Sequence, residues 1–278
     1  MGASALLVLG FLTAVYSRDL PLGVEGEWQW PRVGGRLLPE NLLIAAVGAT
    51  LYCGLVARGF LALAGGPPTR RREAGWVVGL AVAAVALQVV IPIGAPDRFG
   101  LAKWGSVHCY RDCTGYYDVA RDEAREDPSR FFAEYPRWLA TQEVSHLGTH
   151  PPGLIAAYVA ALRVMDEHPG AADILNRASP PSTRRGFEEI ESRSEAMVPP
   201  ADRAALVLIS LATLLACAGT VVPLYLLGRE SLPPQAAWFS AALWPLAPAV
   251  NLFQPLSDTA YPLVSATALA LAAWSARL

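Results

Sequence analysis

An acidic and aromatic segment lies between two strongly apolar stretches of the chain. It begins with the motif Asp-Cys-Thr-Gly-Tyr-Tyr-Asp over residues 112–118. On a helix, Asp112 and Tyr116 would share one face, a single turn apart. A carboxylate at the edge of a low-dielectric region can act as a general base near neutral pH, and a nearby phenol could orient it or donate to a substrate oxygen. The same Asp112 would equally suit a helix N-cap, accepting backbone N–H bonds.

Two histidines close the same segment. His146 and His150 stand four residues apart, and Pro151 and Pro152 follow directly. Proline is common in the first turn of a helix, where its missing N–H costs nothing, so the next helix is expected to begin here. His150 would then lie at the positive end of the helix dipole, where phosphate groups bind. The pair also fits metal binding with Glu143 as a third ligand, or two interfacial histidines without a role.

The composition around these motifs is that of a membrane protein. Of 278 residues, 53% are hydrophobic and 17% are charged, against about 25% charged in soluble domains. The net charge of -2 gives no basic surface for nucleic acid. A bilayer-spanning helix needs roughly 20 apolar residues, and six or seven stretches approach that length. These stretches are residues 3–17, 42–64, 75–95, 151–165, 204–227, 235–253 and 258–276. The sequence therefore predicts an all-α, polytopic transmembrane protein with a partly helical extracytoplasmic loop.

Orientation follows from basic residues beside the spans. Three consecutive arginines at positions 70–72 form the tightest such cluster, and the positive-inside rule places their turn in the cytoplasm. Alternation of the spans then puts loop 96–150 outside an inner or plasma membrane and loop 166–203 inside. We expect a transmembrane hairpin over residues 1–73 and a membrane core over residues 74–278.

An aromatic helical face is expected within the outer loop. Phe131, Phe132, Tyr135 and Trp138 fall on one side of a helix that starts near Pro128. Such a face suits a helix lying in the membrane interface. A packed loop with ordinary aromatic anchors explains the pattern equally well, and the sequence leaves both interpretations open.

These motifs indicate no cofactor. Cys109 and Cys113 stand four residues apart and could form a disulfide in an oxidising compartment, although one helical turn often gives poor disulfide geometry. A zinc site made of both cysteines and His108 lacks an evident fourth ligand. A divalent metal is therefore not indicated.

Together the two motifs resemble the GT-C superfamily of integral membrane glycosyltransferases. The likeness is to the branch that holds lipid A aminoarabinose transferases, protein O-mannosyltransferases and RgtA/B/C/D-like glycosyltransferases. In this branch the first large external loop opens with an acidic pair and a following Tyr, and it ends in a basic residue before Pro-Pro. Here Cys113 replaces the second acid, and His150 stands where Lys is frequent. Asp258, in the run Pro-Leu-Ser-Asp, matches a further position where the family often has Asp.

The resemblance implies a function and a set of roles. A sugar would move from a polyprenyl-phosphate donor to an extracytoplasmic lipid, glycan or protein acceptor by one inverting displacement. Asp112 would be the catalytic base. The expected substrate-binding residues are Tyr116, Tyr117, His146, His150 and Asp258. The family has more spans, so the chain is expected to be incomplete at its C-terminus.

Other functional classes fit the same composition. The main alternative is a non-catalytic membrane scaffold or glycan-binding subunit, whose outer loop would bind a partner or glycan without turnover. A transporter is less well supported, because no expected span carries an acid near its middle.

Overall fold

The computed structural model of the chain describes residues 38–66, 68–96, 99–110, 114–142, 146–194 and 197–277, with short stretches between residues 6 and 29. Within these ranges the protein is almost entirely helical, which confirms the all-α prediction. The strands β1 (Gly23–Val24) and β2 (Trp28–Gln29) pair antiparallel. The chain divides into two compact units, residues 1–36 and residues 37–278. The helices described below belong to the second unit, and the expected span over residues 3–17 lies largely outside the described residues.

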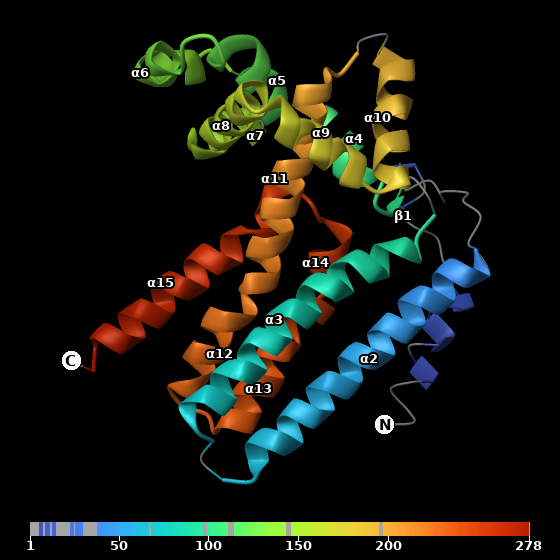
Figure 1. Cartoon of the computed structure of the whole chain (residues 1–278), viewed down its shortest axis with the longest axis vertical. Helices are drawn as coiled ribbons and strands as arrows, with labels where there is room; N and C mark the ends of the chain where they lie inside the picture. Colours follow the sequence, from blue (N-terminus) through green and yellow to red (C-terminus); the bar gives the residue numbers. More distant parts are fainter. Residues whose placement is uncertain are drawn as a thin grey trace. The chain divides into compact units, whose positions relative to one another are not determined.

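Three helical segments are long and apolar enough to cross a membrane, judged by length and composition within the described residues. They are α2 (Pro39–Ala64), α3 (Arg70–Ile93) and the continuous pair α11 (Pro200–Gly219) and α12 (Val221–Arg229). Helices α2 and α3 pack side by side as a hairpin (Figure 1). The domain boundary expected after residue 73 lies at the first turn of α3.

The remaining expected spans are shorter or interrupted. Helix α8 (Gly153–Glu167) and helix α15 (Tyr261–Ser275) each have 15 residues, or roughly 22 Å at 1.5 Å per residue. The stretch expected over residues 235–253 divides into three short helices. They are α13 (Pro234–Ala242), η4 (Trp244–Leu246) and α14 (Pro248–Leu252). Each of these helices has proline in its first turn, where a preceding helix cannot continue. The described residues thus give fewer candidate spans than the six or seven expected.

Between α3 and α11 the chain forms a series of short helices, called here the α4–α10 region. They are α4 (Lys103–Ser106), η2 (Val107–Cys109), α5 (Tyr116–Val119), η3 (Ala120–Ala124), α6 (Pro128–Leu139), α7 (His146–Thr149), α8, α9 (Pro169–Ala178) and α10 (Pro181–Ser194). Helices α8 and α9 pack against α11 (Figure 1). One hydrophobic cluster runs through this region, with Tyr117, Ile155, Leu162, Phe187 and Leu206 almost fully buried.

Contacts inside this region join the two loops that the sequence analysis assigns to opposite sides of a membrane. Arg125, from the expected outer loop 96–150, pairs with Asp166 and Asp202 of the expected inner loop 166–203. The Thr183 hydroxyl donates to the Leu101 carbonyl at 2.8 Å. Segments in direct contact cannot have a bilayer between them. The structure therefore departs from the expected topology, and the reason is that α8 packs within the region rather than crossing away from it.

The aromatic face of α6 is turned toward the protein. Phe131 and Tyr135 are buried, and the rings of Phe131, Tyr135 and Trp138 contact one another at 5.3 to 6.1 Å between centroids. Asp127 caps this helix by accepting from the Arg130 backbone N–H at 3.0 Å. This arrangement favours the packed-loop interpretation over a helix lying in the interface.

A second cluster joins α2 to α13. The Trp238 indole donates to the Val56 carbonyl at 2.9 Å, and the Tyr52 hydroxyl donates to the Ala242 carbonyl at 2.8 Å. The close contact between α2 and Trp238 requires glycine at position 59, because a Cβ there would lie 2.3 Å from Trp238 Cζ2. The two helices therefore run antiparallel in direct contact.

Candidate functional site

The motif that opens the candidate site is described from Thr114 onward, and Asp112 lies outside the described residues. Helix α5 starts only at Tyr116, because Gly115 adopts a left-handed conformation with φ of 67°. Glycine tolerates this conformation without the steric cost of a side chain. Within the described part of the motif, Thr114 and Gly115 therefore precede the helix.

Tyr116 lies at the centre of a group of aromatic and polar side chains. Its side chain is buried, and its ring centroid is 6.3 Å from those of both His150 and Tyr158. Burial raises the pKa of Tyr116 to about 12, and the negative charge of Asp258 acts in the same direction. The phenol therefore keeps its proton at neutral pH. Within the described part of the chain its hydroxyl has no hydrogen-bond partner, so it is free to donate to a ligand.

His150 is held at the junction of α7 and α8. Its backbone carbonyl accepts from the Tyr135 hydroxyl at 3.0 Å, which ties the junction to α6. The ring is partly buried beside Tyr116 and stands just before Pro152, the residue that caps α8. This agrees with the expected place of His150 near a helix start. His146 begins α7, but its side chain is not among those described.

Asp258 approaches the same group from the C-terminal part of the chain. It lies exposed in η5 (Ser257–Thr259), directly before α15, and η5 packs against α11. Its carboxylate is close enough to Tyr116 to contribute to the raised pKa of that phenol. Three of the residues expected to bind substrate, Tyr116, His150 and Asp258, thus gather in one neighbourhood.

Tyr117 points elsewhere and is engaged in a structural contact. Its side chain is 1% exposed, and its hydroxyl donates to Asp202 Oδ2 at 2.8 Å. The Arg121 guanidinium lies over the ring, 5.0 Å from the centroid. Burial and the nearby Asp202 carboxylate raise the pKa of Tyr117, so this phenol stays a donor. Tyr117 therefore joins α5 to α11, and its hydroxyl does not reach the group around Tyr116.

Asp202 is a buried acid that the sequence analysis did not select. It is 1% exposed and sits in the first turn of α11, where a carboxylate is favoured by the helix dipole. Arg125 Nη1 lies 3.2 Å from its other oxygen. The only sequence signal is an acid two residues after the Pro-Pro pair at 199–200. With both oxygens engaged, Asp202 stabilises the region and is a poor candidate base.

His108 forms a second buried network behind Tyr116. Its Nε2 lies 2.8 Å from Ser210 Oγ, and that hydroxyl donates to the Trp104 carbonyl at 3.0 Å. Ser210 must therefore accept from His108 Nε2–H, which leaves Nδ1 to accept from the Tyr158 hydroxyl at 2.7 Å. Burial lowers the pKa of His108 to about 4, so the ring is neutral. This network fixes Tyr158, whose ring lies beside Tyr116.

An unpaired hydroxyl adjoins the group. Thr114 is 6% exposed, and its Oγ1 is buried without a hydrogen-bond partner among the described residues. A buried hydroxyl usually finds a partner, because leaving it unpaired costs about 1–3 kcal/mol. Thr114 stands two residues before Tyr116 in the chain. Thr114 therefore offers a buried, unengaged hydroxyl close in sequence to Tyr116.

Comparison with known proteins does not assign a family. No protein-family model, curated protein or solved structure matches the chain at a significant level. The likeness to GT-C transferases accordingly stays a prediction from the motifs.

Metal ligands do not gather in the described part of the chain, where no group of three or more His, Cys, Asp or Glu side chains could hold an ion. Glu143, the expected third ligand of the histidine pair, lies outside the described residues. Cys109 carries a free thiol, and burial together with the acid Asp118 raises its pKa to about 12. It is therefore a packing residue rather than a nucleophile, and its expected partner Cys113 is also outside the described residues.

Proposed function

We propose that the chain is a membrane glycosyltransferase that moves a sugar from a polyprenyl-phosphate donor to an extracytoplasmic acceptor. The observation that supports this is the packing of the Tyr116 ring beside the His150 ring, 6.3 Å between centroids, with the Asp258 carboxylate near enough to help raise the pKa of the Tyr116 phenol. Asp258 belongs to η5, which packs against α11. A lipid-borne substrate would present its phosphosugar at such a junction between membrane helices and a polar region.

The proposed orientation is consistent with the contacts inside the α4–α10 region. With arginines 70–72 in the cytoplasm, α3 would cross to the outer side and α11 would return. The whole α4–α10 region, including the expected inner loop 166–203, would then be extracytoplasmic in an inner or plasma membrane. A translocated segment of this length tolerates its many charges, because the rule applies chiefly to short loops.

The chemistry would be a single displacement. Asp112 would take the proton of an acceptor hydroxyl, and the acceptor oxygen would attack the anomeric carbon. The bond from that carbon to the phosphate oxygen would break, and the polyprenyl phosphate would leave with the electron pair. His150 and the neutral Tyr116 hydroxyl would donate to the leaving phosphate or to the sugar. Thr114 would add a further donor, and Asp258 would help to position Tyr116.

Mutation of the base and of the phosphate-binding group gives a direct test. Membranes carrying the chain would be incubated with a panel of radiolabelled polyprenyl-phosphate sugars and acceptors. We expect Asp112→Asn to lower transfer by about 10²-fold or more, since general bases contribute on that scale. We expect His150→Ala to raise the donor KM more than it reduces the amount of folded protein.

The matched control is Asp122→Asn, because Asp122 is an exposed acid in the same segment. It should transfer sugar like the wild type. Unchanged turnover in Asp112→Asn would exclude the proposed base. A parallel loss of folded protein and activity in His150→Ala would assign that residue a structural role only.

A glycan-binding subunit without turnover is the second candidate. It is favoured by the engagement of Tyr117 with Asp202, which removes one of the expected substrate-binding groups from the site. Binding of a labelled polyprenyl-phosphate sugar with no transfer to any acceptor, in wild type and Asp112→Asn alike, would select this alternative.

A further inference from the structure

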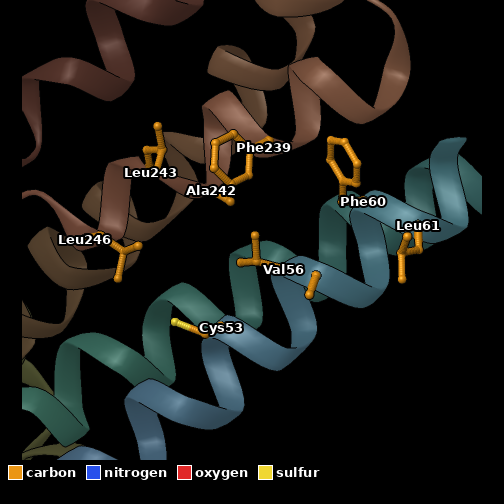
Figure 2. Close-up of a pocket in the computed structure, with 9 residues that line it drawn as sticks. Cys53, Val56, Phe60, Leu61, Phe239, Ala242, Leu243 and Leu246 are labelled. Atoms are coloured by element: carbon orange, nitrogen blue, oxygen red, sulfur yellow. The ribbon is translucent and has the colours of Figure 1, made fainter. Parts of the chain in front are cut away.

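Two hollows lie along the seam between α2 and α13. The larger, of about 650 Å³, is walled by side chains such as Val56, Phe60, Phe239 and Leu243 (Figure 2). No charged residue lines it. Several of these large side chains are strongly exposed, Phe239 by 47% and Leu243 by 50%. Because α2 is one of the candidate spans, the hollow is a groove suited to hydrocarbon.

The smaller hollow, of about 360 Å³, lies at the end of the same seam. It is bordered by the end of α2, the start of α3, the end of α12 and the start of α13. Unlike the groove, it has polar walls, which include Glu73, Arg229 and Gln235.

Helical spacing connects the two hollows. On α2, Phe60 lines the groove and Ala64, one turn on, lines the polar hollow. On α13, Phe239 and Gln235 have the same relation. The rings of Phe60 and Phe239 meet edge to face at 6.3 Å, at the boundary between the two. The seam thus changes from apolar to polar along one continuous stripe.

Three arginines directly precede Glu73, which lines the polar hollow, although they are not themselves among its lining residues. The arginines at positions 70–72 are all exposed in the first turn of α3. In the described part of the chain these arginines form no ion pair. The acid next to them in sequence, Glu73, is engaged instead by Arg229 at 2.8 Å and by the Tyr225 hydroxyl at 2.5 Å. Cations at a helix start are disfavoured by the dipole, which adds to their charge instead of offsetting it. A negatively charged group near this turn would offset both the charges of the arginines and the partial positive charge of the helix start.

We propose that this seam binds an anionic phospholipid of the bilayer, with its phosphate headgroup against the arginines at 70–72 and an acyl chain in the groove between Phe60 and Leu243. The apolar groove selects hydrocarbon, and the unneutralised arginines select negative charge in the headgroup. This site lies between α2, the start of α3 and α13, and it is independent of the group around Tyr116.

The test uses the purified full chain in detergent. Binding of phosphatidylglycerol and of phosphatidylcholine with identical acyl chains would be titrated by native mass spectrometry, with glycerol phosphate as the headgroup alone. We expect phosphatidylglycerol to bind at least about tenfold more tightly than phosphatidylcholine, as three arginines near a headgroup predict. We expect glycerol phosphate to show no binding at the same concentrations.

Two variants separate the headgroup from the chain. Combined Arg70→Gln, Arg71→Gln and Arg72→Gln should abolish the preference for phosphatidylglycerol. Ala57→Trp should fill the groove, because Ala57 lines it from an exposed position. It should weaken binding of both lipids by about tenfold.

Matched controls change the same residue types away from the seam. Leu51→Trp adds an indole to another face of α2, where Leu51 is 70% exposed. Replacement of the three exposed arginines at positions 130, 137 and 177 by glutamine removes equal charge from the α4–α10 region. Both controls should bind phosphatidylglycerol like the wild type. Equal affinity for the two lipids, wild-type binding in either seam variant, or equal binding of glycerol phosphate would overturn the proposal.

Discussion

Acidification should destabilise the protein through His108. This side chain is 1% exposed and hydrogen-bonded as a neutral ring between Tyr158 and Ser210. Burial lowers its pKa to about 4, whereas an unfolded histidine has a pKa of about 6.5. Below pH 6.5 the unfolded state therefore binds a proton that the native state does not bind, and the free energy of unfolding falls until the pH reaches about 4.

The size of the effect follows from these two values. At pH 5 the protonated form of the unfolded histidine exceeds the neutral form by about thirtyfold, while the native ring is still mostly neutral. Linkage then gives a loss of about 2 kcal/mol in the free energy of unfolding between pH 7.5 and pH 5. Above pH 7 this contribution is constant, because His108 is neutral in both states.

Unfolding in detergent, followed by intrinsic fluorescence at several pH values, would measure this loss. The control is His108→Gln, which cannot titrate and should remove about 2 kcal/mol of the pH dependence, even if it is less stable at every pH. The reasoning would be refuted by a wild type whose stability is flat between pH 7.5 and 5, or by the same slope in His108→Gln. His168→Gln serves as a second control, because His168 is exposed and should leave the slope unchanged.

Three further predictions concern packing and topology. Gly59→Ala should destabilise the α2–α13 seam by about 1–3 kcal/mol, because the new Cβ meets an indole, whereas Gly54→Ala, with open space around it, should be neutral or slightly stabilising. Denaturation midpoints of the two variants would settle this. Asp202→Ala should cost about 1–3 kcal/mol in the same assay, because it leaves the buried Tyr117 hydroxyl without its acceptor and removes one of the two acids that pair with Arg125; a loss under about 0.5 kcal/mol would contradict the assignment. Finally, single cysteines at Arg137→Cys and Glu188→Cys should react from the same side of intact cells with an impermeant maleimide, and labelling from opposite sides would show that the two segments do not pack together.

Much of the fold could be predicted because local sequence signals were strong. The apolar length of α2, α3 and α11 identified them as candidate spans, and the pair Asp127 and Pro128 marked the start of α6. The prediction for residues 151–165 was less successful. Their apolar composition suits a span, but composition does not distinguish a membrane helix from a short helix buried in a protein cluster, as α8 is.

The candidate site was predicted in part. Tyr116, His150 and Asp258 were selected from short motifs, and the structure brings them together. Tyr117 could not be separated from its neighbour by sequence, since the direction of each side chain depends on where α5 begins, and Gly115 sets that point. Asp202 was missed, and His108 was considered only as a zinc ligand, because their partners Arg125 and Ser210 are far away in the chain.

The contact between Arg125 and Asp202 has a consequence for biosynthesis. The arginine is made 77 residues before this buried acid, and 41 residues before its other partner, Asp166. A growing chain would therefore leave the Tyr117 hydroxyl without its acceptor, and the guanidinium paired with Asp166 alone, until the ribosome has delivered the first turn of α11. Completion of the α4–α10 region is thus tied to the arrival of the third candidate span, and a chain truncated before residue 200 would leave this region open to quality-control proteases.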